Sequence, residues 1–154
     1  ARRYGKTVVL NPAPAGEIDE ALFRDIDYFT PNETEAEFYT GIRVADEQTA
    51  EQAADRLLEK GVKNVVITLG KTGVYAKTEE FQGIVPSFRV NAVDTTGAGD
   101  AFNGGFCTAL AEGKNVRDAL LFANALAALS VTRRGTSPAM PYREEIEKLL
   151  KGGN

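Results

Sequence analysis

Short apolar segments alternate with amphipathic segments through the first half of this chain. β-branched and apolar residues predict strands at 7–10, 27–30 and 65–69, with shorter strands at 74–76, 84–86 and 88–90. Helical spacing predicts helices at 17–23, from Pro31 through Tyr39, and at 48–60. The segment 48–60 carries its apolar residues on one face, at Ala50, Ala53, Ala54, Leu57 and Leu58.

The second half of the chain is predicted to be mostly helical, at about 99–112, 116–132 and 143–151, before a flexible tail at 152–154. Its longest apolar run, 119–131, is interrupted by Asn124 and is too short to span a bilayer, so it predicts a buried helix. The element order predicts an α/β fold, a doubly wound (Rossmann-like), mostly parallel sheet with helices on both faces. We expect residues 1–154 to form one domain, with an antiparallel edge from the strands after residue 73.

Four turns follow the predicted strands and carry the polar residues of interest. In open α/β sheets, ligands bind beyond the carboxyl ends of the strands. We therefore expect one rim to bring together the turns at Asn11-Pro12, Pro31-Asn32, 70–73 and 94–100.

Composition excludes several classes of function. With 18 basic and 22 acidic residues and a net charge of −4, nothing suggests a nucleic-acid or anionic-membrane surface. The absence of histidine excludes imidazole triads, imidazole bases and imidazole zinc sites. The single Cys107 cannot form an internal disulfide and is expected in the core; with no charged, apolar leader, a cytoplasmic location is expected.

The segment 93–105, VDTTGAGDAFNGG, places a Gly-Ala-Gly turn between two aspartates at a helix start. N–H groups around Gly97, Ala98 and Gly99, with the helix dipole, predict an anion site. Asp100 beside it suits a base that receives a hydroxyl proton, although an aspartate at a helix start also stabilises the dipole. Asp94 suits either a hard-cation ligand or a turn-initiating side chain.

Better-known phosphate loops do not fit this chain. A Walker loop ending at Gly70-Lys71-Thr72 would require glycine where Val65 stands. The dinucleotide fingerprint from Gly97 meets Phe102 in place of its third glycine, so hydride transfer is unsupported.

Asn32 and Glu35 match a helix capping box, which is the favoured interpretation, as do Thr30 and Glu33. The functional alternative has Asn32 touching a phosphate and Glu35 holding magnesium-bound water.

Three further segments have a structural and a functional interpretation. One is a glycine-containing turn, which is typical of a plain hairpin but could also let a nucleotide approach the backbone closely; it consists of Thr68, Leu69, Gly70, Lys71, Thr72 and Gly73. At 130–140, two arginines and Gly135 suit a helix C-terminus, whose carbonyls also suit a monovalent cation. Asn124 is best interpreted as a polar residue that caps or bridges within a buried helix.

Taken together, LNPAPA, TPNETEAE, VITLGKTG, DTTGAGDAFNGG and VTRRGTSPAMPYREEI resemble the ribokinase branch of the ribokinase-like (PfkB) sugar kinases over nearly the whole chain. The resemblance implies ATP-dependent phosphorylation of D-ribose at its 5-hydroxyl, with ATP, Mg²⁺ and an activating K⁺. A sibling kinase for fructose, a nucleoside or a ketodeoxy sugar acid is the alternative, as is a non-catalytic folding or association module.

The resemblance also implies residue roles. Asp100 would be the base, Gly97, Ala98 and Gly99 the anion hole, and Asn32 and Glu35 the phosphate and magnesium motif. Residues 68–73 and Asn124 would meet ATP. Asp94 would hold K⁺ together with the carbonyls of Thr96, Ser130, Arg133 and Gly135, while Ala139 stands where the family often has serine.

The resemblance covers only the second half of such a kinase, without the sugar-contacting first half and its β lid. It therefore implies a fragment that lacks turnover alone and pairs as a homodimer through its exposed strand edge.

Overall fold

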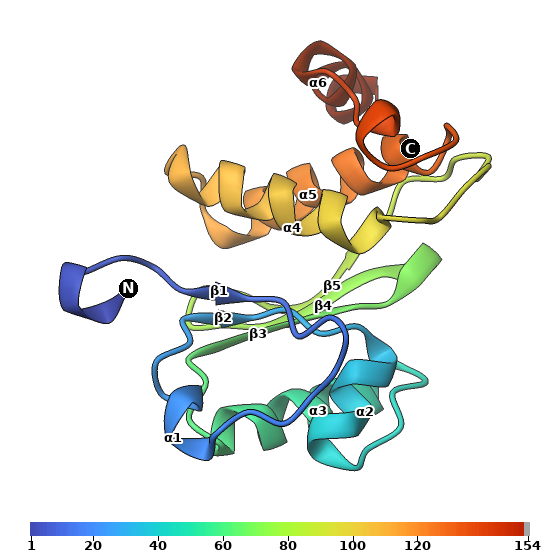
Figure 1. Cartoon of the computed structure of the whole chain (residues 1–154). Helices are drawn as coiled ribbons and strands as arrows, with labels where there is room; N and C mark the ends of the chain where they lie inside the picture. Colours follow the sequence, from blue (N-terminus) through green and yellow to red (C-terminus); the bar gives the residue numbers. More distant parts are fainter. Residues whose placement is uncertain (153–154) are drawn as a thin grey trace. The chain divides into compact units, whose positions relative to one another are not determined.

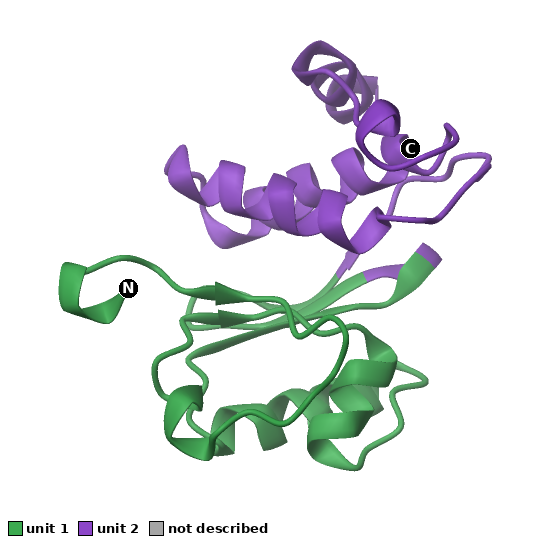
Figure 2. Cartoon of the chain, in the orientation of Figure 1, with its two compact units in different colours: residues 1–70, 74–84 green, residues 71–73, 85–154 purple. Residues whose placement is uncertain are grey.

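A computed structural model describes residues 1–152; positions 153 and 154 of the predicted tail lie outside the described residues, and Gly152 ends the last helix. The chain separates into two compact units (Figure 2), residues 1–70 with 74–84 and residues 71–73 with 85–154. Each unit is described by itself, and the single domain expected from the sequence stays a prediction.

The first unit is built on a mixed sheet with the strand order β1-β2-β3-β4-β5. The strands are β1 (Val9–Leu10), β2 (Tyr28–Phe29), β3 (Asn64–Thr68), β4 (Gly73–Lys77) and β5 (Gln82–Pro86); Gly73 and the end of β5 belong to the second unit. β1, β2 and β3 pair in parallel, whereas β3 and β4 pair antiparallel. The α/β class is therefore confirmed, with the antiparallel strand where the sequence predicted it.

Three helices cover one face of this sheet (Figure 1): α1 (Glu20–Phe23), α2 (Glu33–Thr40) and α3 (Glu47–Glu59). Helix α1 begins three residues later than predicted because the Asp19 side chain accepts a hydrogen bond from the Ala21 N–H at 2.9 Å and caps it. Helix α3 buries Ala50, Ala53, Ala54 and Leu57, as its apolar face predicted. The core beneath these helices includes Phe23, Phe29 and Tyr39 in edge-to-face contacts.

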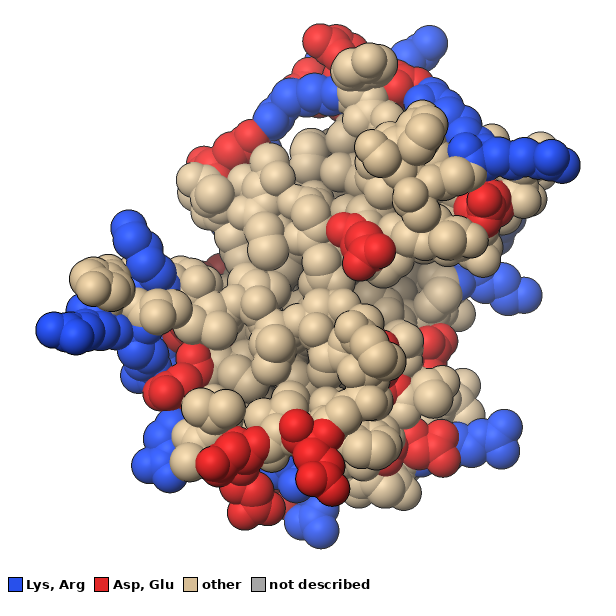
Figure 3. Space-filling model, viewed as in Figure 1, with Lys and Arg blue, Asp and Glu red and all other residues tan. Residues whose placement is uncertain are grey.

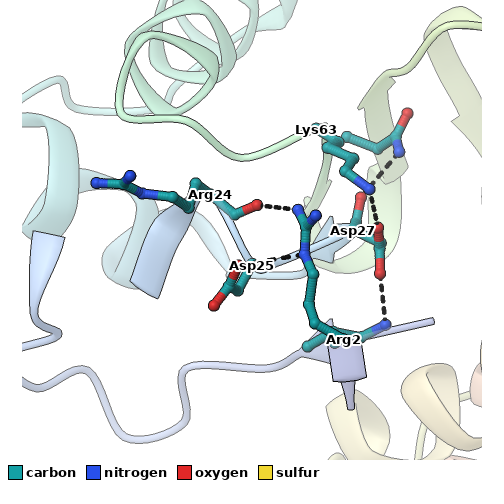
Figure 4. A network of polar contacts seen from close by, with 7 residues as sticks. Arg2, Arg24, Asp25, Asp27 and Lys63 are labelled. Atoms are coloured by element: carbon teal, nitrogen blue, oxygen red, sulfur yellow. Dashed lines mark hydrogen bonds and ion pairs between the residues drawn. The ribbon is translucent and has the colours of Figure 1, made fainter. Parts of the chain in front are cut away.

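A polar network at the amino ends of the parallel strands fixes their alignment (Figure 4). The Asp27 carboxylate accepts hydrogen bonds from the Val8 N–H at 2.8 Å and from Lys63 Nζ at 2.5 Å, and the Asn64 amide donates to the Asp27 carbonyl at 2.8 Å. Burial raises the pKa of Asp27, but the Lys63 and Val8 hydrogen bonds outweigh it and hold the pKa below its ordinary value. One side chain thus ties together the segments leading into β1, β2 and β3.

The second unit is helical: α4 (Ala98–Ala111), α5 (Val116–Ser130) and α6 (Arg143–Gly152), with a short 3₁₀ turn at Ser137–Ala139. Helices α4 and α5 pack closely because Gly105 has no side chain: a Cβ there would lie 3.1 Å from the Ala123 Cα. None of the helices within residues 1–152 combines the length and the apolar character that a bilayer crossing needs.

Two expectations from the sequence are wrong. Residues 88–90 form no strand, because β5 ends at Pro86 and the Ser87 N–H donates to the Thr72 carbonyl at 3.3 Å. Cys107 is exposed, not buried, because the neighbouring Phe106 and Ala109 occupy the inward face of α4.

Candidate active site

The carboxyl ends of β1, β2 and β3 meet at one edge of the first unit. The Asn11 amide donates to the Thr30 carbonyl at 2.8 Å, which joins the segments after β1 and β2. The Thr68 N–H donates to the Pro31 carbonyl at 3.0 Å, and Asn32 forms a parallel bridge with Thr68. Within this unit, the predicted rim is therefore confirmed for the turns at Asn11-Pro12 and Pro31-Asn32, which lie beside the end of β3 at Thr68.

Asn32 and Glu35 lie on this rim and form a complete capping box at the start of α2. Asn32 Oδ1 accepts from the Glu35 N–H, and Glu35 Oε2 accepts from the Asn32 N–H, both at 2.8 Å. The capping interpretation is confirmed, and it uses one carboxylate oxygen. Glu35 Oε1 makes no hydrogen bond or ion pair with residues 1–152, so this largely buried carboxylate retains an oxygen for a magnesium-bound water.

The predicted hairpin turn follows β3 along the chain. Thr68 ends the strand, Leu69 follows it, and Gly70, Lys71 and Thr72 form a 3₁₀ turn before β4. Gly70 has φ +51°, and a Cβ there would make only an ordinary contact, 3.9 Å from Glu33 Oε1, whereas Gly73 has φ +117° and its Cβ would lie 2.2 Å from the Val85 carbonyl oxygen. Gly73 is thus required by packing within the second unit, and the backbone at Gly70 is accessible to a ligand.

The amino end of α4 carries the predicted anion site of the second unit. Gly97 precedes the helix with φ +77° and, as a glycine, has no side chain that could cap it. The Ala98 N–H donates to the Thr95 carbonyl at 3.2 Å, which removes one of the three predicted donors. The N–H groups of Gly97, Gly99 and Asp100 have no acceptor within the described chain, and a Cβ at Gly99 would meet nothing within 4 Å. This end of the helix is open to an anion.

Asp100 lies in the first turn of α4, beside these free N–H groups. It is exposed, and its carboxylate has no hydrogen bond or ion pair with any residue that the structure describes. A carboxylate that caps a helix would accept a hydrogen bond from the first turn, and Asp100 accepts none. The side chain is therefore available to receive a proton from a bound hydroxyl group.

Asp94 joins the loop before α4 to the segment after α5. Its Oδ1 accepts from the Thr96 N–H and its Oδ2 from the Gly135 N–H, each at 3.0 Å. These backbone hydrogen bonds, that from Gly135 first, lower the pKa of Asp94 to about 2. The turn-initiating interpretation is confirmed, and the carboxylate remains ionised and holds Thr96 and Gly135 close together.

The other predicted cation ligands lie around the end of α5. Ser130 is its last residue, and the Val131 carbonyl accepts from the Val93 and Asp94 N–H groups at 2.7 and 3.1 Å. The Arg133 guanidinium pairs with Glu145 of α6, so its side chain is not a ligand. Ala139 is buried and offers no side-chain oxygen. Carboxylate and carbonyl oxygens of this kind suit K⁺, although each Asp94 oxygen already accepts one hydrogen bond.

Asn124 has a structural role within the second unit. It is buried in α5, and its amide donates to the carbonyls of Val85 and Pro86 at 2.9 and 3.2 Å. The bridging interpretation is confirmed, and the nucleotide contact implied by the resemblance stays a prediction.

Two residues of the site were missed from the sequence. Asn11 was noted only as part of a turn, although an asparagine directly after a strand is a signal for a side chain that joins neighbouring strand ends. Thr95, whose carbonyl occupies the Ala98 N–H, gave no signal, because backbone acceptors are visible only in the fold.

Comparison with known proteins shows the family of this chain. The model for the pfkB family of carbohydrate kinases matches residues 1–143. The ribokinase of Haemophilus influenzae is 48% identical over 98% of this chain and 49% of its own length, and a deoxyribokinase of Salmonella typhi is 41% identical over 97% and 49%. The chain thus spans about half the length of these curated relatives.

Solved structures give the same result. The ribokinase of Thermotoga maritima superposes with a TM-score of 0.87 at 45% identity, over 97% of this chain and 50% of that one. The Arabidopsis thaliana ribokinase complexed with ribose and ATP superposes with a TM-score of 0.86 at 35% identity, over 97% and 49%. By family match and by sequence identity, the chain belongs to the pfkB family of carbohydrate kinases.

Proposed function

We propose that this chain is the nucleotide-binding, base-bearing part of an ATP-dependent sugar kinase that phosphorylates D-ribose at its 5-hydroxyl. One observation carries the proposal: the exposed, unpaired Asp100 carboxylate lies beside the free N–H groups at the start of α4. An anion site needs no carboxylate for binding alone, because two negative groups repel each other. A carboxylate is explained if a proton must be removed there.

The reaction divides between these groups. The Asp100 carboxylate takes the proton from the sugar hydroxyl as its oxygen bonds to the terminal phosphorus of ATP. The bond from that phosphorus to the bridging oxygen breaks, and the leaving ADP carries the electron pair. The N–H groups of Gly97 and Gly99 stabilise the charge on the transferred phosphoryl oxygens.

Two cations fit the residues present. Mg²⁺, when bound, neutralises charge on the phosphates, and the free Oε1 of Glu35 would hold one of its waters. K⁺ would be held by Asp94 and by the carbonyls of Thr96, Ser130, Arg133 and Gly135, and it would stabilise the loop before α4. Asn32, Asn124 and residues 68–73 would contact ATP.

Ribose is proposed as the sugar because several of the similar relatives, among them that of H. influenzae at 48% identity, are ribokinases. We further propose that this chain alone has no turnover, because it spans half of its relatives' length and would not hold the sugar in attack geometry. Holding the reacting groups in attack geometry lowers the activation free energy by on the order of 7–11 kcal/mol. The homodimer expected from the sequence stays a prediction.

Calorimetric titration of this chain with Mg-ATP, with and without K⁺, tests the proposal. We expect saturable binding of Mg-ATP that K⁺ strengthens, and at least about tenfold weaker binding of adenosine, which has no phosphates to occupy the helix terminus. Equal binding of adenosine and Mg-ATP, or no binding of either, would refute the nucleotide role. Ribose phosphorylation by the isolated chain at a rate typical of intact kinases would refute the proposed lack of turnover.

A further inference from the structure

An open cavity of about 470 Å³ lies in the first unit, between the start of α3 and the strands β4 and β5. Neither Asn32 nor Glu35 lines it, so it is separate from the rim at the carboxyl ends of the parallel strands. Its wall is mostly polar and consists of Glu47, Gln48, Glu51, Tyr75, Gln82 and Gly83.

Tyr75 of β4 brings a hydroxyl group to this wall that the fold does not use. The residue is 1% exposed, and its hydroxyl has no hydrogen-bond partner within the described chain. Burial, and after it the charge of Glu51, raises the pKa of Tyr75, so the hydroxyl keeps its proton. The neighbouring Gln82 amide nitrogen is a donor and is directed at Glu51 Oε1, at 2.7 Å. A buried hydroxyl without an acceptor destabilises a fold, so an acceptor that enters from the cavity would explain Tyr75.

The charge of the cavity wall is negative, because its described residues include two carboxylates and no basic side chain. Glu47 and Glu51 are one turn apart on α3, and Glu47 has no hydrogen bond or ion pair with residues 1–152. Lys77 lies 3.2 Å from Glu51 but is shared with Asp55, at 2.6 Å. Helix α3 carries four acidic residues and one basic residue, and acidic side chains are prominent over the helices of the first unit in Figure 3. A cationic group therefore fits beside Glu47 and Glu51.

Gly83 keeps the space beside Glu47 open. Its φ is +127°, and a Cβ there would lie 3.9 Å from Glu47 Oε1. A longer side chain at this position would extend into the cavity. The backbone conformation and the free space thus both require glycine here.

We propose that this cavity binds a small primary amine that also carries a hydroxyl group. The ammonium group donates to the carboxylates of Glu47 and Glu51 and replaces the Gln82 amide as a donor to Glu51. Gln82 is exposed, so its side chain can rotate away from the cavity. The hydroxyl oxygen of the amine then accepts the hydrogen bond from Tyr75. A bare metal ion fits less well, because the described residues include no group of three acidic, histidine or cysteine side chains that could hold one.

Titration of the isotope-labelled chain by NMR tests the proposal, with ethanolamine as the probe. We expect saturable shifts of the backbone signals of Tyr75, Gln82 and Gly83. Ethylamine lacks the hydroxyl group and should bind about two- to tenfold more weakly, the loss expected for one hydrogen bond. Ethylene glycol lacks the charge and should give no saturable shift at these residues. Equal binding of all three compounds, or no saturable binding of ethanolamine, would overturn the proposal.

Two variants locate the contacts, and two matched variants serve as controls. Tyr75→Phe should remove the preference for ethanolamine over ethylamine, and Glu47→Gln should weaken both amines about two- to fivefold. Tyr142→Phe changes an exposed tyrosine outside the cavity, and Glu144→Gln changes a glutamate in the first turn of α6, as Glu47 is in that of α3. Both controls should bind ethanolamine as the wild type does. An unchanged preference in Tyr75→Phe, or equal losses in variants and controls, would refute the assigned contacts.

Thermal unfolding without any amine gives an independent measurement. Tyr75→Phe removes a buried hydroxyl that has no partner in the chain, so the thermal midpoint should stay the same or rise. A midpoint several degrees lower would show that the hydroxyl is already satisfied, for example by a bound water, and would overturn the proposal. Neither measurement needs a nucleotide, so their failure would leave the proposed kinase function untouched.

Discussion

Two adjacent glycines of α4 should respond oppositely to the same substitution. Gly104 and Gly105 both lie inside the helix, where glycine is less favourable than alanine by about 0.5–1 kcal/mol. A Cβ at Gly104 would meet nothing within 4 Å. Gly104→Ala should therefore stabilise the protein by about that amount.

Gly105→Ala gains the same helix preference but meets α5. Its Cβ would lie 3.1 Å from the Ala123 Cα and 3.2 Å from Leu126 Cδ1. Leu126 can rotate, whereas the Ala123 Cα belongs to a helix backbone and can move only with it. Overpacking of this kind costs about 1–3 kcal/mol. The net effect should be destabilisation by about 1 kcal/mol, which places the two variants about 1–3 kcal/mol apart.

Thermal and urea unfolding of the two variants and the wild type measure this difference. At this chain length, 1 kcal/mol shifts Tm by about 2–4 °C. We expect Gly104→Ala above the wild type and Gly105→Ala below it. If Gly105→Ala were as stable as Gly104→Ala, the close packing of α4 on α5 would not limit the residue at this position, and our account of this glycine would be wrong.

Three further predictions concern the site. In a longer kinase that carries this sequence and has turnover, Asp100→Asn should lower kcat at least about 10²-fold and leave ATP affinity nearly unchanged, as steady-state kinetics and titration can show; lost affinity with normal turnover would make Asp100 a structural residue. The pKa of Asp94 is lowered from 3.8 to about 2, so its ionised form stabilises the fold above about pH 4, and this contribution is lost as the pH falls toward 2. Acid unfolding of Asp94→Asn should lack that pH dependence. An NMR titration midpoint near 4 for Asp94 would contradict the hydrogen bonds from the Thr96 and Gly135 N–H groups. Gly73→Ala should abolish cooperative unfolding because its Cβ would overlap the Val85 carbonyl, whereas Gly70→Ala should lower the free energy of unfolding by only about 1–2 kcal/mol. Similar circular-dichroism melts for both variants would contradict the close approach of Gly73 to Val85.

The sequence by itself determined most of the elements. The apolar face of α3, the continuous apolar strand β3 and the turn residues around Gly70 and Gly97 are local signals, and they set the α/β class and the order of its elements. The motif around Asp100 pointed to an anion site with an adjacent base. The predicted elements are confirmed because periodicity, capping and glycine conformation depend on residues close together in the chain, whereas the anion site and its base stay predictions.

The tertiary structure decided what each polar group is free to do. Asp94 was assigned as a turn former or a cation ligand, and only the fold shows that both its oxygens are used by Thr96 and by Gly135, 41 residues away. Cys107 was expected in the core and is exposed, because its position on α4 depends on which face packs inward. The sequence shows which donors and acceptors a segment contains. Only the folded chain shows which of them are already hydrogen-bonded, because partners distant in sequence leave no local pattern.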